Sequence, residues 1–386
     1  MKIQLDALLR SQYHCLVIRR FYVHNFRCLE NFELLIEGRS SVLLIGKNGA
    51  GKTTVCLALE ILLKIARGTN RVEELVEPND FTRGHTDVPM RFSIEVTLGG
   101  QTYKYYIAFD FPSEEFKKMR VFEEGLSVED NPVFTRAAAQ VFLAKSNQEQ
   151  KANFLLDWHL AALPIIQERT TKDPLSIFKQ WLAGLVLLRP IPALITGNSD
   201  QETLQPNTNV TNFGAWFSGL LGHAPAAYGT IDKYLNQVMP DLKAITNPLV
   251  GKDARSLEVQ FSNGLGNFAI PFADLSDGEK CFMICAMVLA ANDAYGPLVC
   301  FWDEPDNYLA LSEVGHFIVA LRKAFQSGGQ FIATSHNPEA IRRFSDETTL
   351  VLHRKNHMEP TQVRPLREIA VKGDLVGTLI RDDLEP

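Results

Sequence analysis

The residues best suited to chemistry lie in the stretch LLIGKNGAGKTT, residues 43–54, which passes from an apolar run into glycines, a lysine and two threonines. It matches the pattern G-x-x-x-x-G-K-[ST]. Glycines let backbone N–H groups turn toward phosphate oxygens, and a helix that begins there adds partial positive charge. The pattern predicts a phosphate-binding loop, in which Lys52 reaches the β- and γ-phosphates and the Thr53 hydroxyl ligates Mg²⁺. The candidate binding residues are Gly46, Asn48, Gly49, Ala50, Gly51, Lys52, Thr53 and Thr54.

A second candidate is the stretch LVCFWDEPDN at 298–307, an apolar run that ends in two acidic residues. At the end of a buried strand, Asp303 could hold Mg²⁺ and Glu304 could polarise an attacking water as general base. An acidic turn after a strand is common, so this interpretation depends on the phosphate-binding loop being present in the same chain.

Two further motifs are weaker evidence for a function when each is taken alone. In FADLSDGEK, residues 272–280, Ser276 and Glu279 have the spacing of a helix capping box, which is the simpler interpretation. In FIATSHNPEAI, residues 331–341, an apolar run precedes His336, and a lone histidine after a strand is usually a loop residue.

In this order the motifs resemble those of the ABC-type ATPases, whose signature is LSxGE followed by a basic residue. The resemblance implies that Ser276 and Gly278 complete the ATP site of a second subunit and that His336 senses the γ-phosphate. It places Asp306 in the D-loop of that family. The family also has a Q-loop glutamine after the first helix, and residues 78–89 contain none.

The start of the chain narrows the resemblance to one branch of the family. HNFRCLENFELLI, residues 24–36, is similar to the N-termini of RecF, SMC and OLD-like ATPases, in which Arg27 would approach the nucleotide. The alternative is that Arg27 is an exposed turn residue. Residues 123–136 and 187–195 also resemble stand-alone RecF/OLD-like ATPases of bacteria. The resemblance covers most of the chain and is weakest between about 137 and 180.

Strand and helix patterns alternate along the chain and predict an α/β fold. With the resemblance, this implies an ABC-ATPase head: a P-loop parallel core plus an antiparallel β subdomain, with a helical insertion or lid. Three parts are expected: residues 1–111 with the β subdomain and phosphate-binding loop, a mainly helical insertion at 112–250, and residues 251–386 with the other motifs. The polar stretch 196–212 is predicted to be mobile. The predicted strands lie at 16–23, 32–36, 41–45, 91–98, 103–111, 257–261, 267–272, 298–302, 330–334 and 348–353, and the predicted helices at 53–67, 278–292 and 312–326.

The amino-acid composition limits the classes of protein to which the chain can belong. With 386 residues, 46% hydrophobic and 22% charged, the chain is typical of soluble globular proteins. A formal charge of -6 argues against a uniformly basic DNA-coating protein but leaves room for a local basic groove. The six cysteines are scattered in apolar stretches, which indicates reduced thiols of a cytoplasmic protein. We expect no targeting signal and no membrane contact, since the apolar runs are far shorter than the ~20 residues that span a bilayer.

The resemblance implies an ATPase that converts ATP and water to ADP and phosphate, with ATP and Mg²⁺ as cofactors and with Glu304, His336 and Lys52 as catalytic residues. It implies self-association, as a head-to-tail dimer closed by ATP or a higher oligomer. The part of the chain after Asp303 is too short for the Toprim nuclease of OLD proteins. We therefore expect the activity that this ATPase controls to belong to another protein. The leading hypothesis is the ATPase sensor of a bacterial anti-phage or toxin–antitoxin type system that controls a separate effector, a nuclease or toxin. The alternatives are a RecF-like DNA repair ATPase that clamps DNA and, less well supported by the motifs, the nucleotide-binding subunit of a transporter.

Overall fold

The chain divides into two compact units in the computed structural model, which describes residues 17–112, 118–144, 153–168, 170–264 and 266–369. Unit 1 consists of Met1–Leu185 and Asp346–Pro386, and unit 2 is Val186–Ser345. The expected absence of a targeting signal concerns residues outside the described part, as does Cys15.

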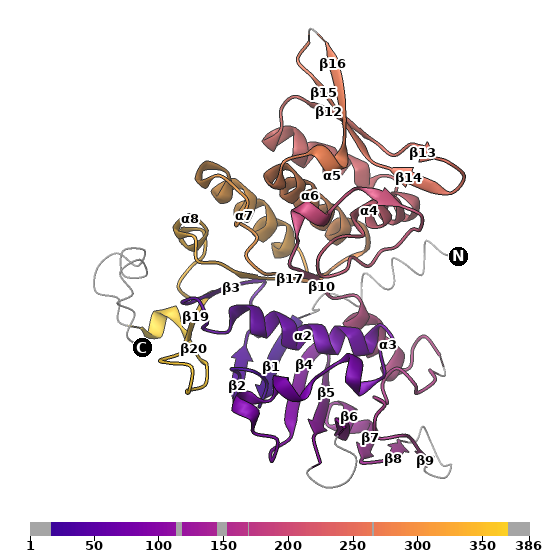
Figure 1. The fold of residues 1–386 in the computed structure, drawn as a ribbon, viewed down its shortest axis with the longest axis vertical. Coiled ribbons are helices and arrows are strands. Elements are labelled where there is room, and N and C mark those ends of the chain that lie inside the picture. Colours follow the sequence, from indigo (N-terminus) through magenta and orange to yellow (C-terminus); the bar gives the residue numbers. More distant parts are fainter. Residues whose placement is uncertain (1–16, 113–117, 145–152, 169, 265, 370–386) are drawn as a thin grey trace. The chain divides into compact units, whose positions relative to one another are not determined.

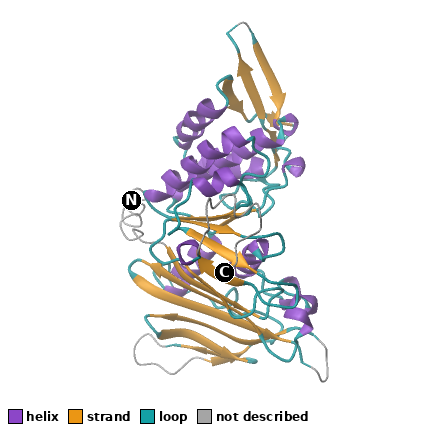
Figure 2. Cartoon of the chain, turned by 90° about the vertical axis from the view of Figure 1, so that its left-hand side faces the viewer, coloured by secondary structure: helices purple, strands orange, loops and turns teal. Residues whose placement is uncertain are grey.

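Unit 1 is built on an eight-stranded antiparallel sheet in the order β2-β1-β4-β5-β6-β7-β8-β9 (Figure 1). Figure 2 shows its strands in orange. The strands are β1 (Val17–His24), β2 (Phe32–Leu35), β4 (Met90–Leu98), β5 (Gln101–Asp110), β6 (Arg120–Val128), β7 (Asn131–Ala137), β8 (Gln140–Leu143) and β9 (Asn153–Leu155).

Alternating apolar residues give this sheet its buried face. In β4 every second residue is buried, from Met90 to Leu98. β4 and β5 pair in the predicted hairpin through Gly99 and Gly100, both at positive φ. On the buried face, the ring centroid of Tyr105 lies 5.4 Å from that of Phe178 in α3 (Pro174–Ala183).

The remaining elements of unit 1 place the phosphate-binding loop. Strand β3 (Ser41–Ile45) is buried at every position and pairs in parallel with β19 (Thr349–His353), which pairs antiparallel with β20 (Gln362–Pro365). After the loop, α2 (Lys52–Ala66) packs against α3 and is buried on most sides. Four short 3-10 helices complete the unit: η1 (Val72–Glu74), η2 (Pro78–Asp80), η3 (Thr82–Gly84) and η6 (Leu366–Glu368).

Unit 2 combines parallel strands with a cluster of helices (Figure 2). Strand β17 (Val299–Trp302) pairs in parallel with β10 (Val186–Leu188) on one side and β18 (Gln330–Thr334) on the other. Helix α6 (Asp277–Tyr295) packs against three other α-helices and one 3-10 helix and is apolar nearly all round, as a core helix should be. The other helices are α4 (Phe213–His223), α5 (Ala227–Val238), α7 (Leu311–Gln326), α8 (Pro338–Arg342), η4 (Pro192–Leu194) and η5 (Phe272–Asp274).

Unit 2 also has two small three-stranded antiparallel sheets, β11-β14-β13 and β12-β15-β16. Their strands are β11 (Asn198–Ser199), β12 (Leu242–Thr246), β13 (Leu249–Val250), β14 (Ala254–Ser256), β15 (Glu258–Ser262) and β16 (Asn267–Pro271).

The prediction of a mainly helical insertion at 112–250 is wrong for the part that contains β6 to β9, because these strands extend the antiparallel sheet. The sequence of β6, RVFEEGLSV, does not show a regular alternation of apolar and polar residues, because Glu123 and Glu124 interrupt it. Glu124 is fully buried although it is an acidic residue. The polar stretch 196–212, predicted to be mobile, contains β11 and a set of side-chain hydrogen bonds.

Glu124 is tolerated in the core because its charge is paired and its oxygens are hydrogen-bonded. It accepts hydrogen bonds from the Tyr105 hydroxyl at 2.9 Å and from the Ala162 and Leu163 N–H groups at 2.6 and 2.8 Å. Arg136, also fully buried, lies 3.7 Å from it. Arg136 donates in turn to the carbonyls of Ala138, Asp157 and Leu160. The pair therefore holds the chain around residues 157–163 against β6 and β7.

We predict that Arg136→Met lowers the free energy of unfolding by about 3–5 kcal/mol, because it leaves a buried carboxylate without its cation. Urea denaturation measures this loss. Lys104→Met is the matched control: it removes an exposed ion pair with Asp130 and should cost less than about 1 kcal/mol. Equal losses for the two variants would contradict the role given to the buried pair.

Candidate nucleotide-binding residues

The predicted phosphate-binding loop joins the end of β3 to the start of α2. Gly46, Gly49 and Gly51 all have positive φ, at 153°, 81° and 100°. The loop residues 47–49 are exposed, while Ala50 and Gly51 are buried. Helix α2 begins without a side-chain cap and without an acidic residue in its first turn. Its N-terminal N–H groups and partial positive charge are therefore well suited to an anion.

Two of the glycines are required by close backbone approach. A Cβ on Gly46 would lie 2.3 Å from the Leu352 carbonyl oxygen of β19. A Cβ on Gly51 would lie 2.9 Å from both the Cys28 Sγ and the Thr361 Oγ1. Only glycine fits these two positions. Its small size lets the loop turn sharply, so that backbone N–H groups can point toward one bound anion.

Lys52 folds back over the loop that it follows. Its buried ammonium donates to the carbonyl oxygens of Gly46 at 2.7 Å and Lys47 at 3.3 Å. A phosphate group on this loop would meet a positive charge already held in place. The loop geometry, the uncapped helix start and Lys52 together fit the triphosphate of a nucleotide.

Residues distant in sequence support this loop from unit 1, and sequence reasoning missed them. The buried Thr361 donates its hydroxyl to the Ala50 carbonyl at 2.9 Å, and its N–H donates to the Cys28 carbonyl at 2.9 Å. The Cys28 Sγ lies 3.6 Å from the Thr54 hydroxyl. The turn at 26–29 and the start of β20 thus fix the loop from two sides.

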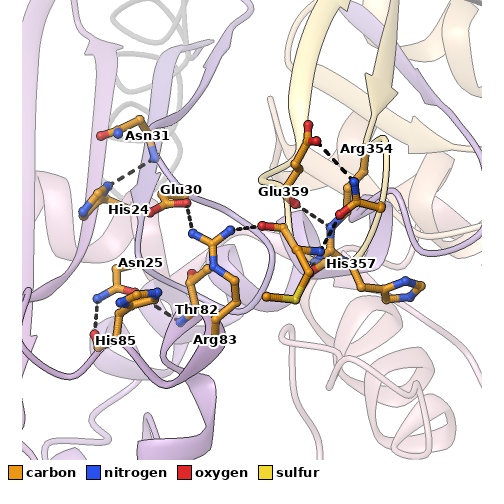
Figure 3. Close-up of polar contacts among 12 residues, drawn as sticks. His24, Asn25, Glu30, Asn31, Thr82, Arg83, His85, Arg354, His357 and Glu359 are labelled. Carbon is orange, nitrogen blue, oxygen red and sulfur yellow. Dashed lines mark hydrogen bonds and ion pairs between the residues drawn. The ribbon is translucent and has the colours of Figure 1, made fainter.

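Figure 3 shows a further layer of contacts around the turn between β19 and β20. Arg83 donates to Glu30 at 2.6 Å and to the Met358 carbonyl. Arg354 donates to the carbonyls of Glu359 at 2.8 Å and His357 at 2.6 Å. These bonds hold the β19–β20 turn in a defined conformation and connect it to the chain near β2.

The NFR turn places Arg27 in a constrained position. Its φ is 53°, its N–H donates to the Asp80 carbonyl at 2.6 Å, and its Nε donates to the Asp80 carboxylate at 2.8 Å. The side chain is about half exposed and lies over the Phe26 ring. Arg27 is thus an ion-paired turn residue in this structure, and its approach to a nucleotide stays a prediction.

In unit 2, one hydroxyl organises both predicted acids. The fully buried Thr334, at the end of β18, donates to the Asp303 Oδ1 at 2.6 Å and accepts from the Glu304 N–H at 2.8 Å. Glu304 has φ 52°, a left-handed conformation that costs a non-glycine residue on the order of 1–2 kcal/mol. Such strain at the end of a parallel strand is typical of functional positions.

Two further residues contact the Glu304 carboxylate. Asn307 donates to Oε2 at 2.6 Å, and the His336 Nδ1 lies 3.4 Å from Oε1. The structure therefore brings the predicted base and the predicted switch histidine together. His336 itself is more than half exposed.

Asp306 lies nearby and is buried. Its Oδ2 accepts the Ser335 hydroxyl at 2.9 Å, while its Oδ1 is buried without a hydrogen-bond partner among the described residues. Burial raises the pKa of the Asp306 carboxyl, and the Glu304 charge adds to this, while Ser335, a backbone N–H and His336 lower it.

The predicted signature forms the start of α6. Ser276 and Glu279 make the capping box that was the simpler interpretation, with the Glu279 N–H donating to Ser276 Oγ at 3.3 Å. Ser276 is exposed. A Cβ on Gly278 would lie 3.0 Å from the Tyr308 carbonyl oxygen, so little room exists there for a side chain. Lys280 is buried and donates to the Pro192 carbonyl at 3.1 Å.

The two residues predicted to bind Mg²⁺ carry oxygen donors, a hydroxyl on Thr53 in unit 1 and a carboxylate on Asp303 in unit 2. Oxygen donors are the type that Mg²⁺ prefers, and the role of these two residues stays a prediction. The described residues contain no group of three or more His, Cys, Asp or Glu side chains that could hold a metal by themselves. Mg²⁺ is commonly bound by one or two protein oxygens together with substrate phosphates, so such a group is not required.

Comparisons with known proteins agree with the fold. Residues 17–157 match the family model described as AAA ATPase domain. An SMC head bound to the C-terminal winged-helix domain of ScpA superposes with a TM-score of 0.51 at 13% identity, over 91% of this chain and 99% of that one. An SMC head with an extended coiled coil, bound to the C-terminal domain of ScpA from Pyrococcus furiosus, gives 0.50 at 10% identity, over 96% and 100%. No curated protein sequence matches the chain.

The family match supports an ATPase domain, and the structural likeness confirms the predicted fold class, an α/β head of the SMC type with parallel and antiparallel parts. In the described part of the chain, no helix is long and apolar enough to cross a membrane. Five cysteines (Cys28, Cys56, Cys281, Cys285 and Cys300) are buried free thiols, as predicted.

We predict that Asp306→Asn stabilises the protein at neutral pH. When folding raises the pKa of a carboxyl group, the free energy of unfolding of the protein falls as the pH rises from the ordinary aspartate pKa to the raised value. The amide keeps an acceptor for Ser335 and carries no charge, so at pH 7.5 the free energy of unfolding should rise by about 1–2 kcal/mol. The gain should shrink at pH 4.5, as measured by urea denaturation at both values.

The exposed Asp200→Asn in the same unit is the control and should change the free energy of unfolding by less than about 0.5 kcal/mol at either pH. A stabilisation by Asp306→Asn that grows as the pH falls would contradict the burial argument.

Proposed function

We propose that the protein is an ATP-binding and ATP-hydrolysing molecular switch that dimerises around ATP and controls a separate effector protein. The observation that carries the proposal is the glycine loop at the uncapped start of α2, with Lys52 held over it. The acids organised by Thr334 and the AAA ATPase match over residues 17–157 support it.

The proposed reaction is ATP + H₂O → ADP + phosphate. The water oxygen forms a bond to the γ-phosphorus, the bond from that phosphorus to the β,γ-bridging oxygen breaks, and ADP leaves with the electron pair. Glu304 accepts the proton of the water, and the nearby His336 is suited to orient Glu304 and to sense the γ-phosphate. Lys52 and the loop N–H groups bind the phosphates. Thr53 and Asp303 would hold Mg²⁺, which offsets the phosphate charge when bound.

The proposed dimer uses the start of α6. Ser276 is exposed at a helix N-terminus, two residues before Gly278. The N–H groups there favour an anion, while Asp277 and Glu279 in the same first turn oppose it. In the proposal Ser276 and Gly278 contact the γ-phosphate of ATP held by a second copy of the chain. ATP then joins two copies head to tail, as a dimer or within a higher oligomer, and hydrolysis releases them.

The effector that the switch controls is proposed to be a separate nuclease or toxin of a bacterial anti-phage or toxin–antitoxin type system. The resemblance to stand-alone RecF/OLD-like ATPases supports this. Both similar SMC heads were solved with a domain of a separate protein, ScpA, which supports a protein partner for this fold. The buried free thiols suit the cytoplasm, where we propose the protein acts.

We predict that Lys52→Ala and Glu304→Gln separate binding from chemistry. Lys52→Ala should weaken ATP binding at least tenfold, because it removes the cation of the loop. Glu304→Gln should bind ATP as the unmodified chain does and lose hydrolysis by a factor of about 10²–10⁴, the usual contribution of a general base. Equilibrium binding of a fluorescent ATP analogue and steady-state phosphate release measure the two effects. Normal hydrolysis by Glu304→Gln would show that another group is the base.

The effector is tested by affinity capture of tagged Glu304→Gln from its native cells in the presence of ATP, with Lys52→Ala as the matched control. We expect a stoichiometric nuclease or toxin that Lys52→Ala does not retain. Recovery of DNA alone would overturn the effector hypothesis and favour a RecF-like DNA clamp.

A further inference from the structure

Arg189 continues the β10 strand beside the predicted acids of unit 2. The parallel register pairs Leu188 with Trp302, and the Asp303 N–H donates to the Leu188 carbonyl at 2.8 Å. The next residues along the two strands, Arg189 and Asp303, are therefore neighbours at the carboxyl edge of the parallel strands. In open α/β sheets this is the edge at which ligands bind.

The backbone of Arg189 is fixed by the polar stretch that the sequence predicted to be mobile. Its N–H donates to the Thr208 carbonyl at 2.7 Å, and the Ile191 N–H donates to the Asn209 carbonyl at 3.4 Å. Val210, which follows Asn209 in the polar stretch, is fully buried and has φ 59°. A β-branched residue rarely adopts this conformation, so it persists only where the surrounding structure enforces it.

The stretch is itself held by side-chain hydrogen bonds. The Asn207 N–H donates to the Asn212 Oδ1 at 2.9 Å, and the Asn207 Nδ2 donates to the Thr211 hydroxyl at 2.7 Å. The Asn212 Nδ2 donates to the Gln205 carbonyl at 3.0 Å. These bonds hold the stretch in one conformation, and through Thr208 they hold the backbone from which the Arg189 side chain extends.

The Arg189 side chain is partly exposed and makes no hydrogen bond or ion pair with any residue that the structure describes. This is unexpected for a guanidinium next to an aspartate, since the fork of five donors matches a carboxylate well. The neighbouring Asp303 instead accepts the hydroxyl of Thr334. The donors of Arg189 thus remain available to an anionic ligand at this edge.

We propose that Arg189 contacts the terminal phosphate of bound ATP and stabilises the negative charge that develops on it during hydrolysis. The inference rests on the proposed ATPase function and assigns one further residue to it. The carboxylates of Asp303 and Glu304 oppose the approach of a phosphate, and a guanidinium carried by the neighbouring backbone offsets this repulsion. A planar, always charged donor suits a phosphate better than a lysine does.

The test compares Arg189→Ala and Arg189→Lys with the unmodified chain in steady-state ATP hydrolysis, with thermal unfolding measured on every protein. Arg255→Ala is the matched control, because Arg255 is another partly exposed arginine of unit 2. Among the described residues, its side chain is hydrogen-bonded only to the Asn247 carbonyl. We expect Arg189→Ala to lower kcat about 100-fold with KM changed less than about threefold, and the lysine to restore part of the loss. The control should stay within about twofold.

An unchanged kcat for Arg189→Ala would overturn the assignment. Equal losses for alanine and lysine, together with a lower unfolding temperature in both, would also overturn it, since they indicate a structural role. These results differ from failure of the proposed function, in which the unmodified chain itself would release no phosphate or Glu304→Gln would hydrolyse ATP at the normal rate.

Discussion

A single buried hydroxyl organises the acidic part of the candidate site. Thr334 accepts the Glu304 N–H and donates to the Asp303 carboxylate, so it fixes two adjacent acids with one atom. This arrangement requires β17 and β18 to run parallel and in register, with Trp302 beside Ala333. It also stabilises the left-handed backbone of Glu304, which would otherwise be unfavourable. The register of two buried strands thus determines the positions of Asp303 and Glu304, the proposed metal ligand and the proposed base.

The phosphate-binding loop depends on a comparable constraint in unit 1. Gly46 and Gly51 are required by the close approach of residues far away in sequence, and one of these, Thr361, also donates a hydrogen bond to the Ala50 carbonyl. A loop that must present N–H groups to an anion cannot use them for its own support. Its carbonyls and its outer surface are therefore held by other segments, here the turn at 26–29 and the start of β20.

The sequence predicted the elements that carry strong local signals. The apolar run of β3, the glycine pattern before α2 and the run of β18 lie where they were expected, because burial on both faces and glycine geometry leave few alternatives. The capping box at Ser276 is equally local. Among the strands that were missed, β6 is obscured by the buried Glu124, which looks like a surface residue until its partner Arg136 is seen. Strands β8 and β9 are only 4 and 3 residues long. Thr334, Thr361 and Arg189 could not be predicted, because their contacts come from strand register and from pairing with distant segments.

In the proposed mechanism, ATP joins two copies of the chain. Sedimentation equilibrium of the Glu304→Gln protein with Mg²⁺ and either ATP or ADP tests it most directly. We predict the monomer mass of 43.3 kDa with ADP and at least twice that mass with ATP. We also predict that adding Ser276→Ala abolishes the ATP-dependent increase in mass. A monomeric mass with either nucleotide, at concentrations where ATP binding is saturated, would contradict ATP-dependent dimerisation.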